Sequence, residues 1–99
     1  MNLSPDFAGR LARAIGRELR LARLNRGWTQ QDVAEALGSH RPCIARTEAG
    51  RHLPELPRLV VHAAHVGVGL DELGRVVDAV LAGERAGAVL DARTKEAST

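Results

Sequence analysis

The sequence predicts an all-α fold, because apolar residues recur at helical spacing along most of the chain and strand patterns are nearly absent. β-branched residues are few, and no long stretch alternates apolar and polar positions. The 99 residues are enough for one domain, since two separate cores would need roughly 100 or more residues each. Hydrophobic residues make up 44% and charged residues 26% of the chain, a typical globular balance.

The first helix is expected to begin with Ser4 as its N-cap and Pro5 as its first helical residue. It is expected to end before Gly27, which can adopt a left-handed conformation. One face is apolar and comprises Phe7, Leu11, Ile15, Leu19 and Ala22. The other faces carry six arginines, and they are either a DNA-facing surface or a solvated one.

The second helix has the most complete start signal in the chain. Thr29 is placed as its N-cap and Asp32 three residues later, as in a capping box. Trp28 and Val33 are spaced as a hydrophobic staple. Gly38 is expected to close this helix.

The third helix is expected to start from a cap at Ser39 or His40, to tolerate Pro42 in its first turn, and to end at Gly50. The fourth should begin near Glu55. Its expected apolar residues are Leu56, Leu59, Val60, Ala63 and Val66. The fifth follows the glycines of residues 67–69. Its expected apolar residues are Leu73, Val76, Val77, Val80 and Leu81, with Gly83 as a plausible stop.

Two short helices joined by a glycine-containing turn, between about residues 29 and 49, form a helix-turn-helix arrangement. Ala34 is small where the helices must cross, and Ile44 faces back into the angle between them. The segments 27–38, 44–50 and 67–73, with Pro54, resemble the lambda-repressor-like family, also called the Xre or Cro/C1 type. The resemblance spans roughly residues 11–75. It implies a compact five-helix DNA-binding domain, here with a C-terminal helix extension.

The resemblance also implies roles for individual residues. The third helix would lie in the major groove of duplex DNA. The residues that would face the bases are Arg41, Pro42, Cys43, Ala45 and Arg46. Those that would contact phosphates or brace the third helix are Thr29, Gln30, His40, Arg51 and His52. The resemblance further implies a largely buried ion pair between Arg23 and Glu48.

Other kinds of site are poorly supported by the sequence. A single cysteine, Cys43, excludes an intramolecular disulfide and is either an inert side chain or a redox sensor near DNA. The histidines His52, His62 and His65 either bind a metal or serve packing and solvation, and the second reading is preferred. We expect no metal, no cofactor and no enzymatic activity, since no catalytic arrangement is evident. One Phe, one Trp and no Tyr argue against a base-stacking platform.

The charge distribution and the fifth helix suggest how the chain is organised. The net charge of +2 divides into +4 over residues 1–26, 0 over 27–53 and −2 over 54–99. We expect a DNA-binding domain over residues 1–83 and a tail, partly helical or disordered, over 84–99. The apolar face of the fifth helix either forms a homodimer interface or completes the monomer's core; its residues are Val76, Val77, Val80 and Leu81.

These features lead to one preferred function and two alternatives. We expect a sequence-specific regulator of transcription that binds double-stranded DNA as a dimer, acting as a repressor in the bacterial cytoplasm, with no signal peptide or membrane segment. The first alternative is an antitoxin that binds DNA and also a toxin protein, with residues 84–99 as the docking surface. The second is a protein-interaction module that uses the same fold.

Overall fold

A computed structural model describes residues 3–97 of the chain, with side chains through residue 86. Over this range it contains five α-helices and no strand, which confirms the all-α prediction. The helices are α1 (Phe7–Asn25), α2 (Gln30–Ala36), α3 (Arg41–Glu48), α4 (Leu56–Val66) and α5 (Leu70–Ala97).

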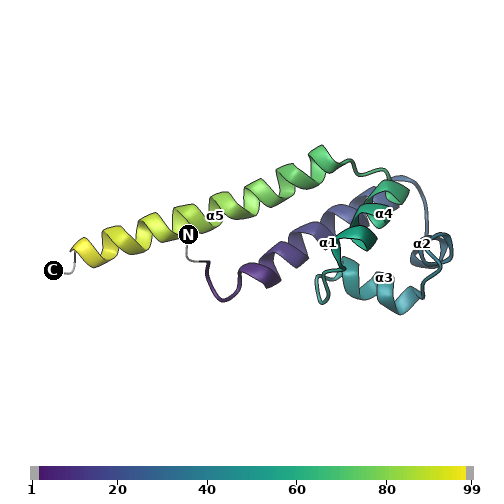
Figure 1. The fold of residues 1–99 in the computed structure, drawn as a ribbon, viewed down its shortest axis with the longest axis horizontal. Helices are drawn as coiled ribbons and strands as arrows, with labels where there is room; N and C mark the ends of the chain where they lie inside the picture. Colours follow the sequence, from purple (N-terminus) through teal and green to yellow (C-terminus); the bar gives the residue numbers. More distant parts are fainter. Residues whose placement is uncertain (1–2, 98–99) are drawn as a thin grey trace.

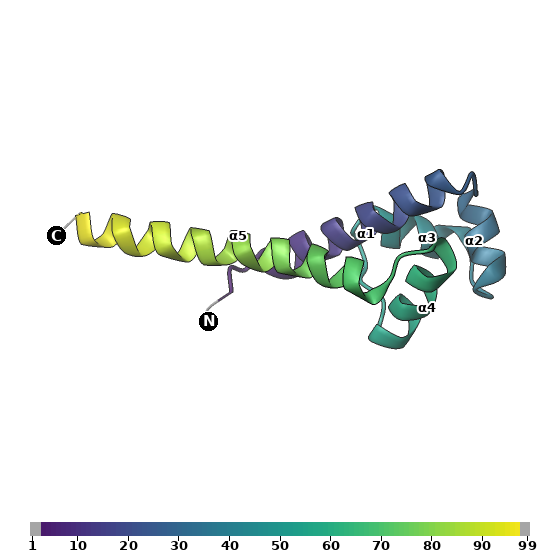
Figure 2. The same ribbon diagram turned by 90° about the horizontal axis from the view of Figure 1, so that it is seen from above.

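The helices surround α1, which contacts α3, α4 and α5 (Figure 1). α2 packs against α3 and α4 near the C-terminal end of α1. α5 returns antiparallel to α1 and continues beyond the start of α1, as both views show (Figures 1 and 2). This projection gives the molecule principal extents of 58 × 24 × 22 Å.

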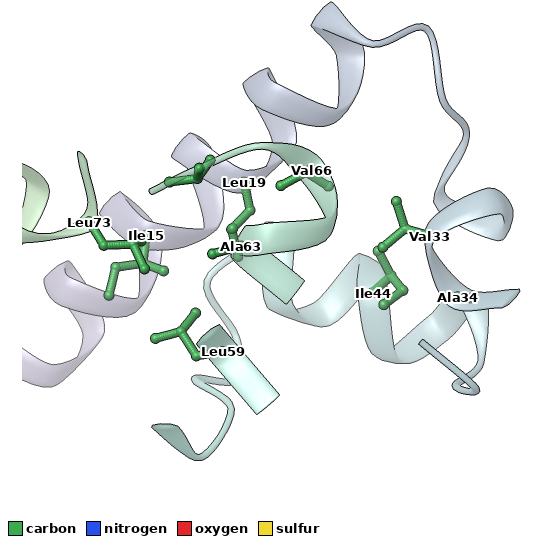
Figure 3. Packing of buried hydrophobic residues seen from close by; sticks show 10 residues of the cluster. Ile15, Leu19, Val33, Ala34, Ile44, Leu59, Ala63, Val66 and Leu73 are labelled. Atoms are coloured by element: carbon green, nitrogen blue, oxygen red, sulfur yellow. The ribbon is translucent and has the colours of Figure 1, made fainter. Parts of the chain in front are cut away.

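The core is a single aliphatic cluster to which all five helices contribute (Figure 3). Its largest fully buried side chains are Leu19, Val33 and Val66. Trp28 is half-buried and packs against the same cluster, next to the start of α2. Burial of an aliphatic side chain stabilises the fold by about 1.5–3 kcal/mol, so this cluster supplies the main driving force for folding.

The turns between the helices follow the local signals in the sequence. The capping box of α2 is present: Thr29 Oγ1 accepts from the Asp32 N–H at 3.0 Å, and Asp32 accepts from the Thr29 N–H at 2.8 Å. His40 is the N-cap of α3, although its side chain makes no capping hydrogen bond. Gly38 has a left-handed φ of 62°, as the turn between α2 and α3 requires.

The predicted start of α1 is wrong. The helix begins at Phe7, and its N-cap is Asp6, which makes no side-chain capping hydrogen bond. Ser4 instead binds Glu84 on α5: its N–H donates at 3.0 Å and its hydroxyl at 2.6 Å. Arg10 pairs with the same carboxylate. A buried carboxylate needs several hydrogen-bond donors. Ser4 supplies two of them to Glu84 and therefore does not cap α1.

Two further expectations about the C-terminal half are wrong. Gly83 does not end α5, which runs through it to Ala97. An internal glycine costs a helix only about 1 kcal/mol relative to alanine, and the contacts of Glu84 anchor the next turn to α1. Leu56 is 70% exposed and takes no part in the core. It is the first residue of α4, and the buried face of that helix begins with Leu59.

α1 and α3 approach each other most closely at Gly16, a buried residue in the middle of α1. A Cβ added there would overlap the backbone carbonyl oxygen of Thr47 and would lie 2.7 Å from that of Glu48. Both oxygens belong to backbone, which cannot rotate away as a flexible side chain can. The absence of a side chain at Gly16 therefore sets the distance between α1 and the last turn of α3.

Replacing Gly16 by alanine should destabilise the protein, although alanine is the better helix former. We expect Gly16→Ala to lower the free energy of unfolding by about 1–3 kcal/mol, because the helices must move apart. Gly74→Ala is the matched control, since a Cβ at Gly74 in α5 meets nothing within 4 Å. It should stabilise the protein by about 0.5–1 kcal/mol. Urea unfolding of both variants measures the difference, and equal effects would contradict the close approach.

Candidate nucleic-acid interface

α3 has one buried face and one exposed face. Its buried residues are Ile44, Thr47 and Glu48. The residues predicted to face bases lie outside this face: Arg41, Pro42 and Arg46 are exposed, and Cys43 and Ala45 are half-buried. The structure therefore brings the predicted base-facing residues together on the accessible side of one short helix.

A buried ion pair fixes this helix to α1. Arg23 Nε lies 2.7 Å from Glu48 Oε2, and Arg23 Nη2 lies 3.0 Å from Glu48 Oε1. The two side chains are only 8% and 2% exposed. The third nitrogen, Nη1, donates to the backbone carbonyl of Trp28 at 2.7 Å. The Glu48 carboxylate raises the pKa of Arg23. The residues that were expected to pair are thus joined by a bidentate contact.

Gln30 connects this buried pair to the exposed face of α3. Its amide nitrogen donates to Glu48 Oε1 at 3.1 Å, and its amide oxygen accepts from Arg41 Nη1 at 3.3 Å. A carboxylate on one side and a guanidinium on the other leave only this amide orientation. Gln30 on α2 therefore links Arg41 to the buried ion pair of Arg23 and Glu48 and helps to position it.

Arg46 and Cys43 are neighbours on the same helix. Arg46 Nη2 lies 3.4 Å from Cys43 Sγ. Hydrogen bonds from Arg46 and then from Ser39 lower the pKa of the Cys43 thiol. The contact holds the Arg46 guanidinium close to the first turn of α3.

The residues expected to contact phosphates or to brace α3 differ in whether their side chains are free. Arg51 and His52 are exposed in the loop that follows α3, and His40 is exposed at its start. The Thr29 hydroxyl, by contrast, caps α2, and the Gln30 amide is engaged on both sides. Thr29 and Gln30 thus act within the protein, as a cap and as a brace.

Comparison with known proteins agrees with this geometry. A family model described as a helix-turn-helix domain matches residues 14–76. The chain belongs to this helix-turn-helix domain family. The match covers α2, α3 and α4, most of α1 and the start of α5, so it includes every residue of the network around Glu48. No curated protein and no solved structure matches the chain.

The helix-turn-helix family match supports DNA binding. No group of three or more metal-ligating side chains is found there. None of its helices has the length and apolar character needed to cross a membrane.

The helix-turn-helix domain buries one histidine, His62 on α4, one of the three histidines for which packing or solvation was preferred to metal binding. It is 3% exposed, and its Nε2 has no hydrogen-bond partner. His65, three residues later, is exposed. Burial lowers the pKa of His62; the Glu48 charge opposes this effect, and His65 adds to it.

The residues expected to form a dimer interface face inward to a large extent. Val76 and Val77 pack against the core of their own chain. Val80 and Leu81 are half-buried. Much of this face of α5 therefore covers α1 of the same molecule.

Sequence reasoning missed two contacts that join helices, one between α1 and α3 and one between the N-terminal part of the chain and α5. Gly16 could have been singled out, since a glycine inside a helical pattern usually has a packing reason. The cluster of Ser4, Arg10 and Glu84 left no local signal, because its members are separated by up to 80 residues.

Removal of Arg23 should be among the most damaging single changes. Arg23→Ala would leave Glu48 charged and buried, which costs about 3–5 kcal/mol. Arg20→Ala, on the exposed side of the same helix, should change the free energy of unfolding by no more than about 0.5 kcal/mol. Urea unfolding measures both. A loss below about 1 kcal/mol for Arg23→Ala would contradict the contribution assigned to the pair.

The buried neutral His62 should make stability depend on pH. Its pKa is lower in the folded protein than in the unfolded chain, so the unfolded chain binds more protons as the pH falls through about 6.5. Stability should be highest above this value and should decrease as the pH falls below it, because the unfolded chain then takes up a proton that folded His62 resists. His62→Gln should flatten this dependence, whereas His65→Gln should not. Thermal unfolding at several pH values tests this expectation.

Proposed function

We propose that the protein is a sequence-specific regulator of transcription that binds double-stranded DNA through α3. It acts as a repressor of the lambda-repressor-like type in the bacterial cytoplasm. Membership of the helix-turn-helix family supports DNA binding. The geometry that favours sequence-specific reading is the exposed face of α3.

The observation that carries the proposal is the placement of Arg41 and Arg46. Both are exposed on α3, while Ile44, Thr47 and Glu48 on its other face are buried. The major groove admits an α-helix, and an arginine can form two hydrogen bonds with guanine. Arg41 is in addition held by Gln30, which reduces the freedom it would lose on binding. Pro42 and Ala45 offer apolar contact, for example with a thymine methyl group.

Phosphate contacts would set the orientation of the domain on the duplex. Arg51, His52 and His40 are exposed at the two ends of α3 and suit this role. Arg10, by contrast, pairs with Glu84, so not every arginine of α1 is free for DNA. Few basic side chains are free to contact phosphates, and the net charge is only +2. Both favour binding that depends on the DNA sequence more than on nonspecific electrostatic attraction.

We further propose that the protein binds as a homodimer on adjacent half-sites, because a single recognition helix reads only a few base pairs. α5 is the proposed interface, and Val80 and Leu81 are its more accessible members, since Val76 and Val77 pack on the core. Val76, Val77, Val80 and Leu81 are all half-buried, which also fits a monomer whose core they complete. A monomeric mass at tens of micromolar would contradict the dimer.

Selection of bound sequences from random duplex DNA tests the proposed function. We expect one enriched motif, palindromic if a dimer binds. Arg41→Ala and Arg46→Ala should each weaken binding to it by about 5-fold to 150-fold, the equivalent of roughly 1–3 kcal/mol. Arg75→Ala is the matched control, because Arg75 is exposed on α5, and it should bind nearly as the parent does. Absence of enrichment would favour a protein-interaction module.

An antitoxin remains the second candidate, and one observation favours it. α5 continues to Ala97, well beyond the body of the molecule (Figure 2). A projecting helix of this kind could dock a toxin through residues 84–99. Co-purification of a stoichiometric partner that is lost when residues 87–99 are removed would support this function over a simple repressor.

A further inference from the structure

α4 is apolar on almost every side. Between its ends, Leu56 and Val66, the only polar residues are Arg58, His62 and His65. A helix that is apolar all round is normally buried on all sides. α4 instead lies at the edge of the body of the molecule, and no described helix covers its outer side (Figure 2). Apolar side chains on that side therefore remain in contact with water.

The exposed apolar side chains gather where α4 leads into α5. Leu56 and Leu70 are 70% and 69% exposed, more than any other large hydrophobic side chain among the described residues. Leu56, Val60 and Ala64 are spaced by four residues and so form one row along α4. These three residues and Leu70 are here called the corner surface. An exposed apolar patch of this kind marks an interaction site.

A hollow of about 330 Å³ opens in the corner surface. All of its described lining residues are aliphatic or glycine, and they include Val60, Ala64 and Leu70. A charged ligand would lose its hydrogen bonds to water there and find no side chain to replace them. The hollow therefore suits an aliphatic side chain of another protein molecule.

Charges of both signs border the hollow. A Cβ on Gly67 would overlap the Arg26 guanidinium, and a Cβ on Gly69 would lie 2.5 Å from Asp71 Oδ1; both glycines line the hollow. Arg26 and Asp71 are exposed, and the ion pair of Asp71 with Arg75 is at the surface. A second copy in a two-fold arrangement presents the same two charges in reverse, so opposite charges meet across the contact. A border with charges of one sign would repel a copy of itself.

We propose that the corner surface binds the corner surface of a second copy of this chain. Leu56 and Ala64 lie four residues on either side of Val60. Antiparallel packing of two α4 helices about Val60 therefore places Leu56 of each copy against Ala64 and the hollow of the other. The projecting side chain and the hollow that receives it belong to one surface, as a two-fold contact requires.

This contact is weak and is separate from the dimer interface proposed above. The corner surface offers fewer than the roughly 20–30 residues that each side of a standard interface uses. It does not include Val80 or Leu81, so it would join one proposed dimer to another. A weak contact becomes effective when both molecules are held on one DNA, because their local concentration is then high. The corner surface would thus make binding to neighbouring sites cooperative.

Cooperative binding rests on the proposed function, whereas self-association does not and is measured without DNA. Two-dimensional NMR and sedimentation equilibrium of the full chain are compared at rising protein concentration, up to the millimolar range. We expect signals of residues 56–71 to shift with concentration while the mean mass increases. The dependence of the shifts on concentration gives the association constant.

Leu56→Asp and Leu70→Asp test the contact. Each leucine is the first residue of its helix and is exposed, and an acid is favourable at that position, so both variants should fold. Each should weaken the association at least ~10-fold, because the contact would bury a charge without a partner. Ala8→Asp is the matched control, since it adds the same charge to the exposed first turn of α1, and it should associate as the parent does. Urea unfolding verifies that all three variants are folded.

The other outcomes would overturn the proposal. Signals of residues 56–71 that do not shift at the highest concentration would mean that no second copy covers the corner surface. Shifts confined to residues 76–81, with a dimeric mass that both leucine variants keep, would assign all self-association to the other interface. Equal association of the parent, Leu56→Asp and Leu70→Asp would have the same consequence.

DNA that carries two neighbouring copies of the selected motif tests the cooperative role. Leu70→Asp should bind a single motif as the parent does and lose cooperativity on the pair. Unchanged cooperativity would overturn this role and leave the self-association standing. Failure of the parent to bind any duplex would instead contradict the proposed function.

Discussion

The exposed face of α3 depends on the buried ion pair of Arg23 and Glu48. Removing two charges from water is costly, and the cost is offset only when geometry and further hydrogen bonds are good. Both conditions are met here, since the bidentate contact is supplemented by the Trp28 carbonyl and by Gln30. Because an unmatched charge would be costly, α3 cannot rotate or slide on α1 without breaking the pair. The pair thus fixes the direction in which Arg41 points.

Close backbone contact reinforces this electrostatic constraint. Gly16 lets α1 approach the carbonyl oxygens of Thr47 and Glu48, in the same turn of α3 that holds the ion pair. Toward the other end of α1, Arg10 and Ser4 hold Glu84 of α5. α1 is therefore a central support, with α3 bound along one part and α5 along another. Arginines of a single helix serve buried pairing, surface pairing and solvation, so their number alone says little about DNA.

One buried polar group on the inner face of α4 has no hydrogen-bond partner. Val33 and Leu19 are fully buried in the aliphatic core, whereas His62 buries a ring nitrogen, Nε2, that has no hydrogen-bond partner. A well-packed hydrophobic residue at this position would avoid the cost of burying an imidazole.

The sequence by itself determined the features that depend on neighbours along the chain. The helical class, the capping box of Thr29 and Asp32 and the turn at Gly38 all arise from contacts a few residues apart, and spacing reveals them. The tertiary structure alone decided that Ser4 binds Glu84 across 80 positions and that α5 continues past Gly83. It also decided that Val76 and Val77 face their own core. These outcomes depend on which helices meet in space, and a buried charge or apolar face is satisfied by whichever partner the fold brings to it.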